Sequence, residues 1–400
     1  MKSIVFEGKI LKIGMVQVLS KLTKKAYHWK VSPIKYVKIK DDKLPNENYV
    51  KVQNIQSGIC GSDMTFYTCK QSASIAFFPV PGSEITYLGH ETVGKIAEVG
   101  KNVKNLKLGE RVTMLKYLAC CDIKGLSPQC KSCSEGNYAT CENYGEESTV
   151  KQFTGAGFGD YYYAPESQLL KIPDEITNDQ AVLIEPFAVS LHSVLKRVPK
   201  DNEKVLVIGA GMIGLGVIQF IKVLSPNCKV YVMEYNKNKH EFAKKLGADV
   251  ILEGDPYKAV AQATGGKLYK KGKNQMIMGG FDIIYDSVGK GTLFNDTLRW
   301  LRPQGTLVKI GYQMIKTKFD ETPIWWQGLN IVGCDAHGLE DYNGEKIYTF
   351  ELVMRLMKEN KLITDGFITH RFKLDDYKKA FKLLIENPKD TIKVVLDCQD

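Results

Sequence analysis

Apolar residues in the middle of the chain fall into alternating runs of strand length and helix length. The first unit of this pattern has an apolar strand at 205–208, a glycine-rich turn, a helical run at 213–224 and a second strand at 229–233. Further runs predict helices at 239–246 and 293–301, and strands at 250–252, 281–286, 306–310 and 331–332. Strands that alternate with helices over roughly 150 residues predict an α/β fold with a parallel, doubly wound sheet, whose ligands bind at the carboxyl ends of its strands.

The flanking sequence predicts a second domain. Residues 1–56 are predicted to form short strands and turns, with a half-buried strand running from Tyr49 into Ile55. The remaining predictions are strands at 92–99, 155–165 and 169–172, an amphipathic helix at 178–196 interrupted at Glu185 and Pro186, and a surface insertion at 265–280. The last segment predicts helices at 348–360 and 374–386 and strands at 369–372 and 393–396. We expect domains at 1–177 and 178–338, with residues 339–400 returning to the first domain.

Composition is that of an ordinary globular protein and excludes several other classes. The 400 residues are 44% hydrophobic and 25% charged, which suits two domains with sizeable cores. No apolar run approaches the ~20 residues of a membrane-spanning helix. Lys9, Lys12 and Gly14 interrupt any signal-peptide core, so we expect a cytoplasmic location.

The net charge of +10 comes mostly from the N-terminal segment. Residues 1–53 hold 12 lysines against 4 acidic residues. These lysines are not interleaved with the aromatic residues of a nucleic-acid-reading motif. We therefore interpret them as a solvated basic face and expect neither a nucleic-acid partner nor a membrane partner.

The glycine turn after the first strand has the pattern of a dinucleotide-binding site. Gly209 permits a tight turn, Gly211 lets a pyrophosphate approach the backbone, and Gly214 lets the helix lie close to the sheet. The helix N-terminus offers N–H groups to the phosphates. Glu234, twenty residues past the last glycine, can accept both ribose hydroxyls and would repel a 2′-phosphate.

Two neighbours of Glu234 favour NAD over NADP. Tyr235 and Asn236 stand where an arginine for the 2′-phosphate would be expected. Ile213 and Lys239 complete the predicted cofactor site.

Cysteine, histidine and glutamate residues predict metal binding. Cys60, His90 and Glu185 each lie in a segment marked by glycine or proline, and their side chains form a set that holds zinc with one position open. Zinc would acidify a bound alcohol, whose hydride can then pass to the nicotinamide. Ser62 could hydrogen-bond the substrate oxygen and pass its proton outward. A second group of cysteines crowds into one loop: Cys120, Cys121, Cys130, Cys133 and Cys141.

Taken together, these motifs resemble those of a known family. GICGSD, YLGHETVGKIAEVG, the C-x2-C-x7-C run, LIEPFAVSLHSV, VLVIGAGMIG and THRFKLDDYKKAF occur in the order found in zinc-dependent medium-chain dehydrogenases/reductases. The chain is most similar to the branch of sorbitol, threonine and related polyol or amino-alcohol dehydrogenases. That resemblance implies a Rossmann domain beside a mainly β, GroES-like catalytic domain, and a homodimer or homotetramer.

The resemblance also implies roles for individual residues. Cys60 and His90 become catalytic zinc ligands, with Glu91 and Glu185 as two carboxylates of which either is the third ligand. Ser62 becomes the hydroxyl of the proton relay, although Thr65 stands where many relatives have a histidine. Cys130, Cys133 and Cys141 match three ligands of a structural zinc in the loop 120–141, and either Cys120 or Cys121 completes the site.

The sequence therefore predicts a zinc-dependent, NAD-linked dehydrogenase. Its substrate would be a small molecule, a secondary alcohol of a polyol, sugar, cyclitol or amino-alcohol, oxidised to the ketone in a cleft between the domains. Two alternatives remain: a simpler alcohol dehydrogenase or aldehyde reductase that uses NADP, and a non-catalytic NAD-binding module. The sequence does not identify the alcohol or the physiological direction.

Overall fold

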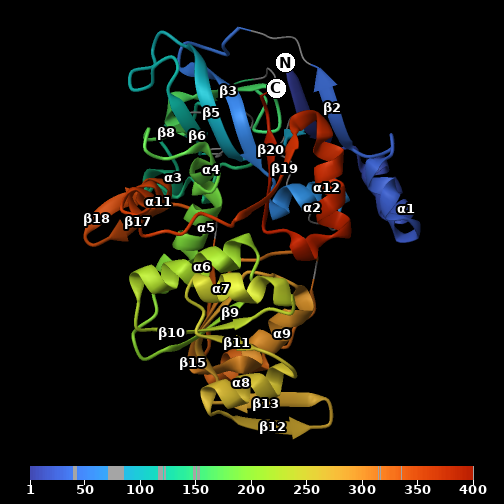
Figure 1. Cartoon of the computed structure of the whole chain (residues 1–400), viewed down its shortest axis with the longest axis vertical. Helices are drawn as coiled ribbons and strands as arrows, with labels where there is room; N and C mark the ends of the chain where they lie inside the picture. The colour runs from blue at the N-terminus through green and yellow to red at the C-terminus, as the bar shows by residue number, and fades with distance from the viewer. Residues whose placement is uncertain are drawn as a thin grey trace. The chain divides into compact units, whose positions relative to one another are not determined.

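The computed structural model describes residues 1–38, 43–70, 85–115, 120, 123–146, 150, 154–313, 315, 317–334 and 336–399. The chain divides into two compact units (Figure 1). The first comprises Met1–Glu185 and Phe367–Asp400, and the second Pro186–Gly366. The chain thus returns to the first unit at Phe367, whereas the sequence placed this return at residue 339. Among the described residues, no helix has both the length and the apolar character needed to cross a membrane.

The second unit is built on a six-stranded sheet in the order β11-β10-β9-β14-β15-β16, with every neighbouring pair parallel. Its strands are β9 (Lys204–Ile208), β10 (Lys229–Met233), β11 (Val250–Leu252), β14 (Phe281–Asp286), β15 (Leu301–Lys309) and β16 (Asn330–Gly333). Its helices are α6 (Met212–Leu224), α7 (His240–Lys245), α8 (Pro256–Thr264), α9 (Gly291–Trp300), α10 (Thr322–Gln327) and α11 (Thr349–Lys358), with a short η4 (Lys237–Lys239). The predicted doubly wound sheet is confirmed.

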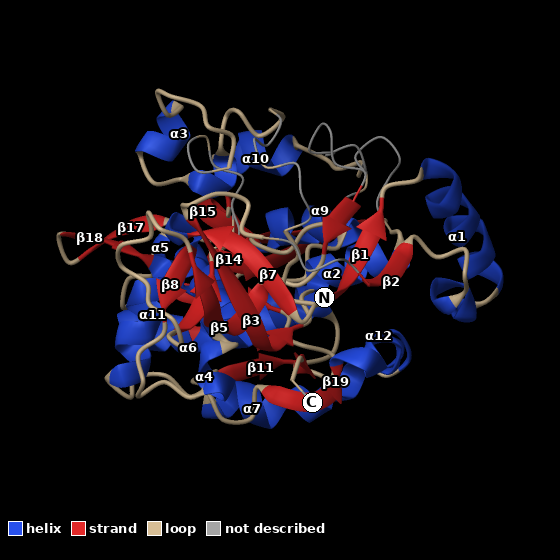
Figure 2. Cartoon of the chain, turned by 90° about the horizontal axis from the view of Figure 1, so that it is seen from above, coloured by secondary structure: helices blue, strands red, loops and turns tan. Residues whose placement is uncertain are grey.

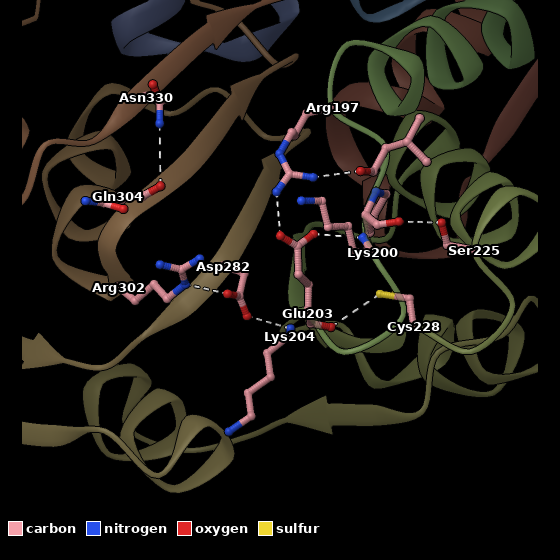
Figure 3. A network of polar contacts seen from close by, with 12 residues as sticks. Arg197, Lys200, Glu203, Lys204, Ser225, Cys228, Asp282, Arg302, Gln304 and Asn330 are labelled. Carbon is pink, nitrogen blue, oxygen red and sulfur yellow. Dashed lines mark hydrogen bonds and ion pairs between the residues drawn. The ribbon is translucent and has the colours of Figure 1, made fainter. Parts of the chain in front are cut away.

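Polar contacts tie together the amino ends of three strands of this sheet (Figure 3). Asp282 in β14 accepts a hydrogen bond from the Lys204 N–H at the start of β9 (2.8 Å) and pairs with Arg302 in β15. Nearby, Glu203 pairs with Arg197, and its carbonyl accepts a bond from the Cys228 thiol (3.4 Å). The carboxyl ends of the strands, at the other end of the sheet, are where ligands bind in such folds.

Two antiparallel hairpins extend this unit: β12 (Lys267–Lys271) with β13 (Asn274–Met278), and β17 (Leu339–Tyr342) with β18 (Glu345–Tyr348). The first hairpin forms the segment that the sequence predicted as a surface insertion. Its strands were not predicted, because residues 267–271 are mostly lysine and have no alternating apolar pattern, and the apolar run at 276–278 is only three residues long.

The first unit contains a seven-stranded sheet, ordered β19-β20-β3-β5-β6-β8 with β7 also paired to β3, and a three-stranded sheet, β2-β1-β4. Its strands are β1 (Lys2–Glu7), β2 (Ile34–Lys38), β3 (Tyr49–Gly58), β4 (Ile85–Tyr87), β5 (Glu91–Val99), β6 (Arg111–Met114), β7 (Tyr161–Pro165), β8 (Leu169–Lys171), β19 (Ile368–Lys373) and β20 (Lys393–Asp397). Its helical segments are α1 (Ile10–Leu22), η1 (Lys24–His28), α2 (Gly61–Thr68), α3 (Lys131–Ser134), η2 (Tyr138–Thr140), η3 (Glu166–Gln168), α4 (Asn178–Ala181), η5 (Leu374–Asp376), α12 (Tyr377–Glu386) and η6 (Pro388–Asp390). The C-terminal β20 pairs with β3, which leads to Cys60.

Helix α1 corrects the prediction of only strands and turns in residues 1–56. This helix lies at the edge of the first unit beside β2 (Figure 2). Apolar residues occupy most of its positions, so the pattern as a whole does not distinguish a two-residue from a 3.6-residue period. The tertiary contacts of this segment therefore decide that it is a helix. Val16 is fully buried, and the Gln17 side chain donates to the Cys69 carbonyl (2.8 Å).

The interruption predicted at Glu185 and Pro186 is wrong. The break lies at residues 182–183, between α4 and α5 (Ile184–Leu195), and Pro186 is the third residue of α5. The first turn of a helix tolerates proline because its N–H groups have no intrahelical partner.

Candidate metal centres and cofactor site

Cys60 is held at the junction of β3 and α2 in the first unit. It is the N-cap residue of α2, and its backbone N–H donates to Asp63 Oδ2 (3.0 Å). Burial, followed by the negative charge of Glu91, raises the pKa of the Cys60 thiol to about 11, while a hydrogen bond with Ser62 acts in the opposite direction. A cation is therefore needed to keep this sulfur as a thiolate.

His90 lies between two carboxyl groups. Its Nδ1 is 3.9 Å from Asp63 Oδ1 and its Nε2 is 4.0 Å from Glu185 Oε1. Asp63 also accepts a hydrogen bond from the Gly89 N–H (3.3 Å), which ties the loop before His90 to α2. Burial raises the pKa of Glu185 to about 8, although His90 lowers it.

Glu91 is the first residue of β5 and is paired with a buried lysine. Lys393 Nζ, from the start of β20, lies 2.6 Å and 2.5 Å from the two Glu91 carboxylate oxygens and also donates to the Ile59 carbonyl (3.3 Å). The two side chains are 1% and 3% exposed. Burial lowers the pKa of Lys393, but the negative charges of Glu91, Cys60 and Glu185 together raise it by more, so the net shift is upward.

The structure brings together three of the four predicted ligands of a catalytic metal. One ligand atom each from Cys60, His90 and Glu91 lies within 4.8 Å of the others, and Glu185 lies beside His90. Thiolate, imidazole and carboxylate donors fit zinc, and three protein ligands leave a position open. Ser62 contacts the Cys60 thiol, whereas the Thr65 hydroxyl donates to the Gly61 carbonyl of its own helix (3.2 Å).

A second group consists of four thiols. Cys120, Cys130, Cys133 and Cys141 place their sulfurs within 4.8 Å of one another, and the Cys120 and Cys141 sulfurs are 3.5 Å apart. Four thiolates around zinc at ~2.3 Å stand about 3.8 Å from each other, so this geometry fits a closed structural site. The Cys133 N–H holds the pKa of Cys130 down at about 6. Cys121, the alternative fourth ligand, lies outside the described residues.

The predicted glycine turn connects β9 to α6 in the second unit. Gly209 has a φ of +88°, a conformation that side chains disfavour. A Cβ on Gly214 would lie 2.0 Å from the Gly209 carbonyl oxygen, whereas a Cβ on Gly211 would meet nothing within 4 Å. This open space at the N-terminus of α6 fits a pyrophosphate.

Glu234 is held against this turn. Its Oε2 accepts a hydrogen bond from the Ala210 N–H (2.8 Å), and its Oε1 accepts one from the Asn236 N–H (2.7 Å). Lys239 is near enough for Glu234 to raise its pKa, although burial lowers that pKa by more. The carboxylate is thus fixed next to the backbone that would hold a dinucleotide.

The sequence analysis assigned no site role to three side chains that organise these sites. Lys393 neutralises Glu91, and Asp63 connects Cys60 to the loop of His90. The Ser287 hydroxyl, at the end of β14, donates to the Ile208 carbonyl (2.7 Å) and packs under the glycine turn. Only Asp63 had a signal in the sequence, its place three residues after Cys60, which favours a capping interaction.

Comparisons with known proteins agree with this geometry. The family models described as alcohol dehydrogenase GroES-like domain and zinc-binding dehydrogenase match residues 46–174 and 213–358. L-galactonate-5-dehydrogenase of Escherichia coli K12 is 29% identical over 88% of this chain and 92% of its own length. D-xylulose reductase A of Aspergillus oryzae is 30% identical over 86% of this chain and 89% of its own length.

A solved structure shows the same fold. The crystal structure of 2R,3R-butanediol dehydrogenase from Bacillus subtilis has a TM-score of 0.72 at 26% identity, covering 92% of this chain and 96% of that one. Together with the matched family models, these relatives show that the chain belongs to the zinc-dependent medium-chain dehydrogenase/reductase family.

Proposed function

We propose that this protein is an NAD-linked, zinc-dependent dehydrogenase that oxidises a secondary alcohol of a polyol, sugar, cyclitol or amino-alcohol to the ketone. The observation that carries the proposal is the grouping of Cys60, His90 and Glu91 within 4.8 Å in a chain that also carries a dinucleotide turn. The names of its relatives, which refer to galactonate, xylulose and butanediol, support a substrate with several hydroxyl groups.

The side chains of the first unit would bind the metal and orient the substrate alcohol. Cys60, His90 and one carboxylate would hold zinc, and bound zinc and NAD would supply an acidified alcohol hydroxyl and a hydride acceptor. Ser62, beside the Cys60 thiol, would accept a hydrogen bond from that hydroxyl and pass its proton on. Glu91 is paired with Lys393 through both oxygens, so Glu185 could bind the metal beside His90 without losing a partner, and Glu91 remains the alternative third ligand.

The second unit selects the cofactor. The Glu234 carboxylate, held by the Ala210 N–H, would accept the ribose hydroxyls and repel a 2′-phosphate. Gly211 leaves the space that the pyrophosphate needs. These two features support NAD rather than NADP.

The proposal is tested by following the absorbance of NADH or NADPH formed from NAD or NADP with a panel of polyols, sugar acids, aminocyclitols, threonine and simple alcohols. Zinc is measured on the same preparations of the wild type, of Cys60→Ser and of a control, Cys398→Ser, which changes a cysteine outside both groups. We expect one class of alcohol to reduce NAD. Cys60→Ser should lose activity and one of two zinc ions, and Cys398→Ser should keep both.

Two results would contradict the proposal. Turnover of the alcohols with NADP but not with NAD would favour the simpler reductase and remove the role given to Glu234. No turnover with any alcohol, and equal zinc in the wild type and Cys60→Ser, would favour a binding module without a catalytic metal.

A further inference from the structure

Helix α1 presents an apolar face that the first unit does not cover. Leu11, Met15, Val18 and Leu22, which we call the α1 stripe, are between 53% and 83% exposed. Their spacing of four, three and four residues places them within about 60° of the helix circumference, at 100° per residue. Val16, on the opposite side of the helix, is fully buried. Large, aligned and exposed apolar side chains mark an interaction surface.

The surroundings of the stripe are cationic. Residues 8–38 contain eight lysines and no acidic residue. Lys12 and Lys21 flank the stripe on its two sides, and Lys24 and Lys25 follow in η1. Lys12 pairs with Glu7, whereas Lys21 and Lys24 are exposed.

A basic hollow adjoins this region within the same unit. It has a volume of about 360 Å³ and is lined mainly by Trp29, His28 and the lysines at 25, 378, 379 and 382. Glu386 also lines it and lies 3.9 Å from Lys382. The Trp29 ring is 46% exposed, so an aromatic side chain and lysines from η1 and α12 share one surface.

We propose that α1 and the basic hollow bind the protein to the surface of an anionic lipid bilayer, in place of the solvated face without a membrane partner that the sequence predicted. An apolar stripe with lysines on both sides is the pattern of a helix that lies in the membrane interface, and tryptophan favours the same depth. Lysines next to the stripe attract acidic headgroups. At 13 residues, α1 is about 20 Å long and lies on the bilayer rather than crossing it.

The same observations argue against a second copy of this chain as the occupant. Two α1 helices packed through their stripes would bring the exposed Lys21 of each copy toward lysines of the other, whereas Lys12 is already paired with Glu7. No acidic residue in 8–38 relieves that repulsion. The stripe also lies outside the matched family models, which begin at residue 46, so the dehydrogenase fold does not account for it.

The test is flotation of the full-length protein with vesicles of phosphatidylcholine, alone or mixed with phosphatidylserine. We expect binding only to the mixed vesicles, weakening as salt is added. Leu11→Ser with Leu22→Ser should weaken binding at least tenfold, roughly, from the lost apolar burial. Lys21→Glu with Lys24→Glu should weaken it by about 25-fold or more, at roughly fivefold per lysine.

Matched controls separate the surface from general effects. Leu108→Ser removes an equally exposed leucine and Lys258→Glu reverses an exposed lysine elsewhere, and both should bind like the wild type. Circular dichroism should show all variants folded, since every changed side chain is exposed. Brominated lipids should quench tryptophan fluorescence in the wild type but not in Trp29→Phe.

Three outcomes would overturn the proposal. The first is no binding to anionic vesicles. The second is binding that the leucine pair does not weaken, because this would be adsorption by net charge alone. The third is self-association without lipid binding, detected as a smaller particle for the Leu11→Ser, Leu22→Ser variant than for the wild type. This result would make the stripe an interface between copies.

Discussion

Replacing Lys393 with methionine should destabilise the first unit strongly while leaving its volume almost unchanged. The Lys393 ammonium and the Glu91 carboxylate are 3% and 1% exposed, and both carboxylate oxygens contact the ammonium nitrogen. Removing one partner of such a pair leaves a buried, uncompensated charge, which costs about 3–5 kcal/mol. For a folding unit of roughly 200 residues, this corresponds to a melting temperature lower by about 10 °C.

The assay is thermal and urea unfolding of the zinc-loaded protein near neutral pH. Because the pKa of Lys393 is raised in the folded state, its contribution is complete below the ordinary lysine pKa of 10.5 and is lost only as the pH rises through the folded value. The control is Lys95→Met, which makes the same chemical change at an exposed position of β5.

A double variant separates charge from packing. Lys393→Met with Glu91→Gln leaves no buried charge, so it should recover at least half of the lost stability. The prediction is refuted if the free energies of unfolding of Lys393→Met and Lys95→Met differ by less than about 1 kcal/mol. It is also refuted if the double variant is no more stable than Lys393→Met.

Three further predictions concern the cofactor turn and the response to acid. Gly214→Ala should lower the melting temperature, since its Cβ would meet a carbonyl oxygen at 2.0 Å. Gly211→Ala should keep the wild-type melting temperature and weaken NAD binding measured by calorimetry. Equal melting temperatures for the two variants would contradict the steric role of Gly214. Glu234→Ser should shift the NAD to NADP ratio of kcat/KM toward NADP by at least tenfold, roughly, because a repulsive charge is removed, and an unchanged ratio would contradict the role of this carboxylate. Burial lowers the pKa of His28, so protonation of His28 opposes folding, and the free energy of unfolding should fall as the pH drops below 6.5. The urea midpoint of His28→Asn should fall less between about pH 7 and pH 5 than that of the wild type. An equal fall would exclude His28 as the cause.

Sequence patterns predicted the buried parallel sheet closely. β10 and β14 occupy the residues predicted for them, 229–233 and 281–286, because fully buried strands appear as short apolar runs between turn residues. The hairpin of β12 and β13 was missed as structure, since β12 is mostly polar and exposed and the apolar run of β13 is only three residues long. Helix α1 was missed because apolar residues on both its buried and its exposed faces removed the contrast that marks a helix.

The sequence by itself determined the chemistry available to this protein: a glycine turn with an acid twenty residues on, three spaced thiols with Cys120 or Cys121 as the fourth, and a cysteine, a histidine and two glutamates suited to zinc. Local spacing encodes the glycine turn and the cysteine loop because each depends on neighbouring residues, whereas Cys60, His90, Glu91 and Glu185 are far apart and were grouped through the resemblance to a known family. Only the tertiary structure decided that Lys393 forms an ion pair with Glu91, that Glu185 lies beside His90, and that α1 leaves its leucines exposed. Glu91 and Lys393 are 302 residues apart, and such a contact is set by strand pairing between β20, β3 and β5, which no local pattern specifies.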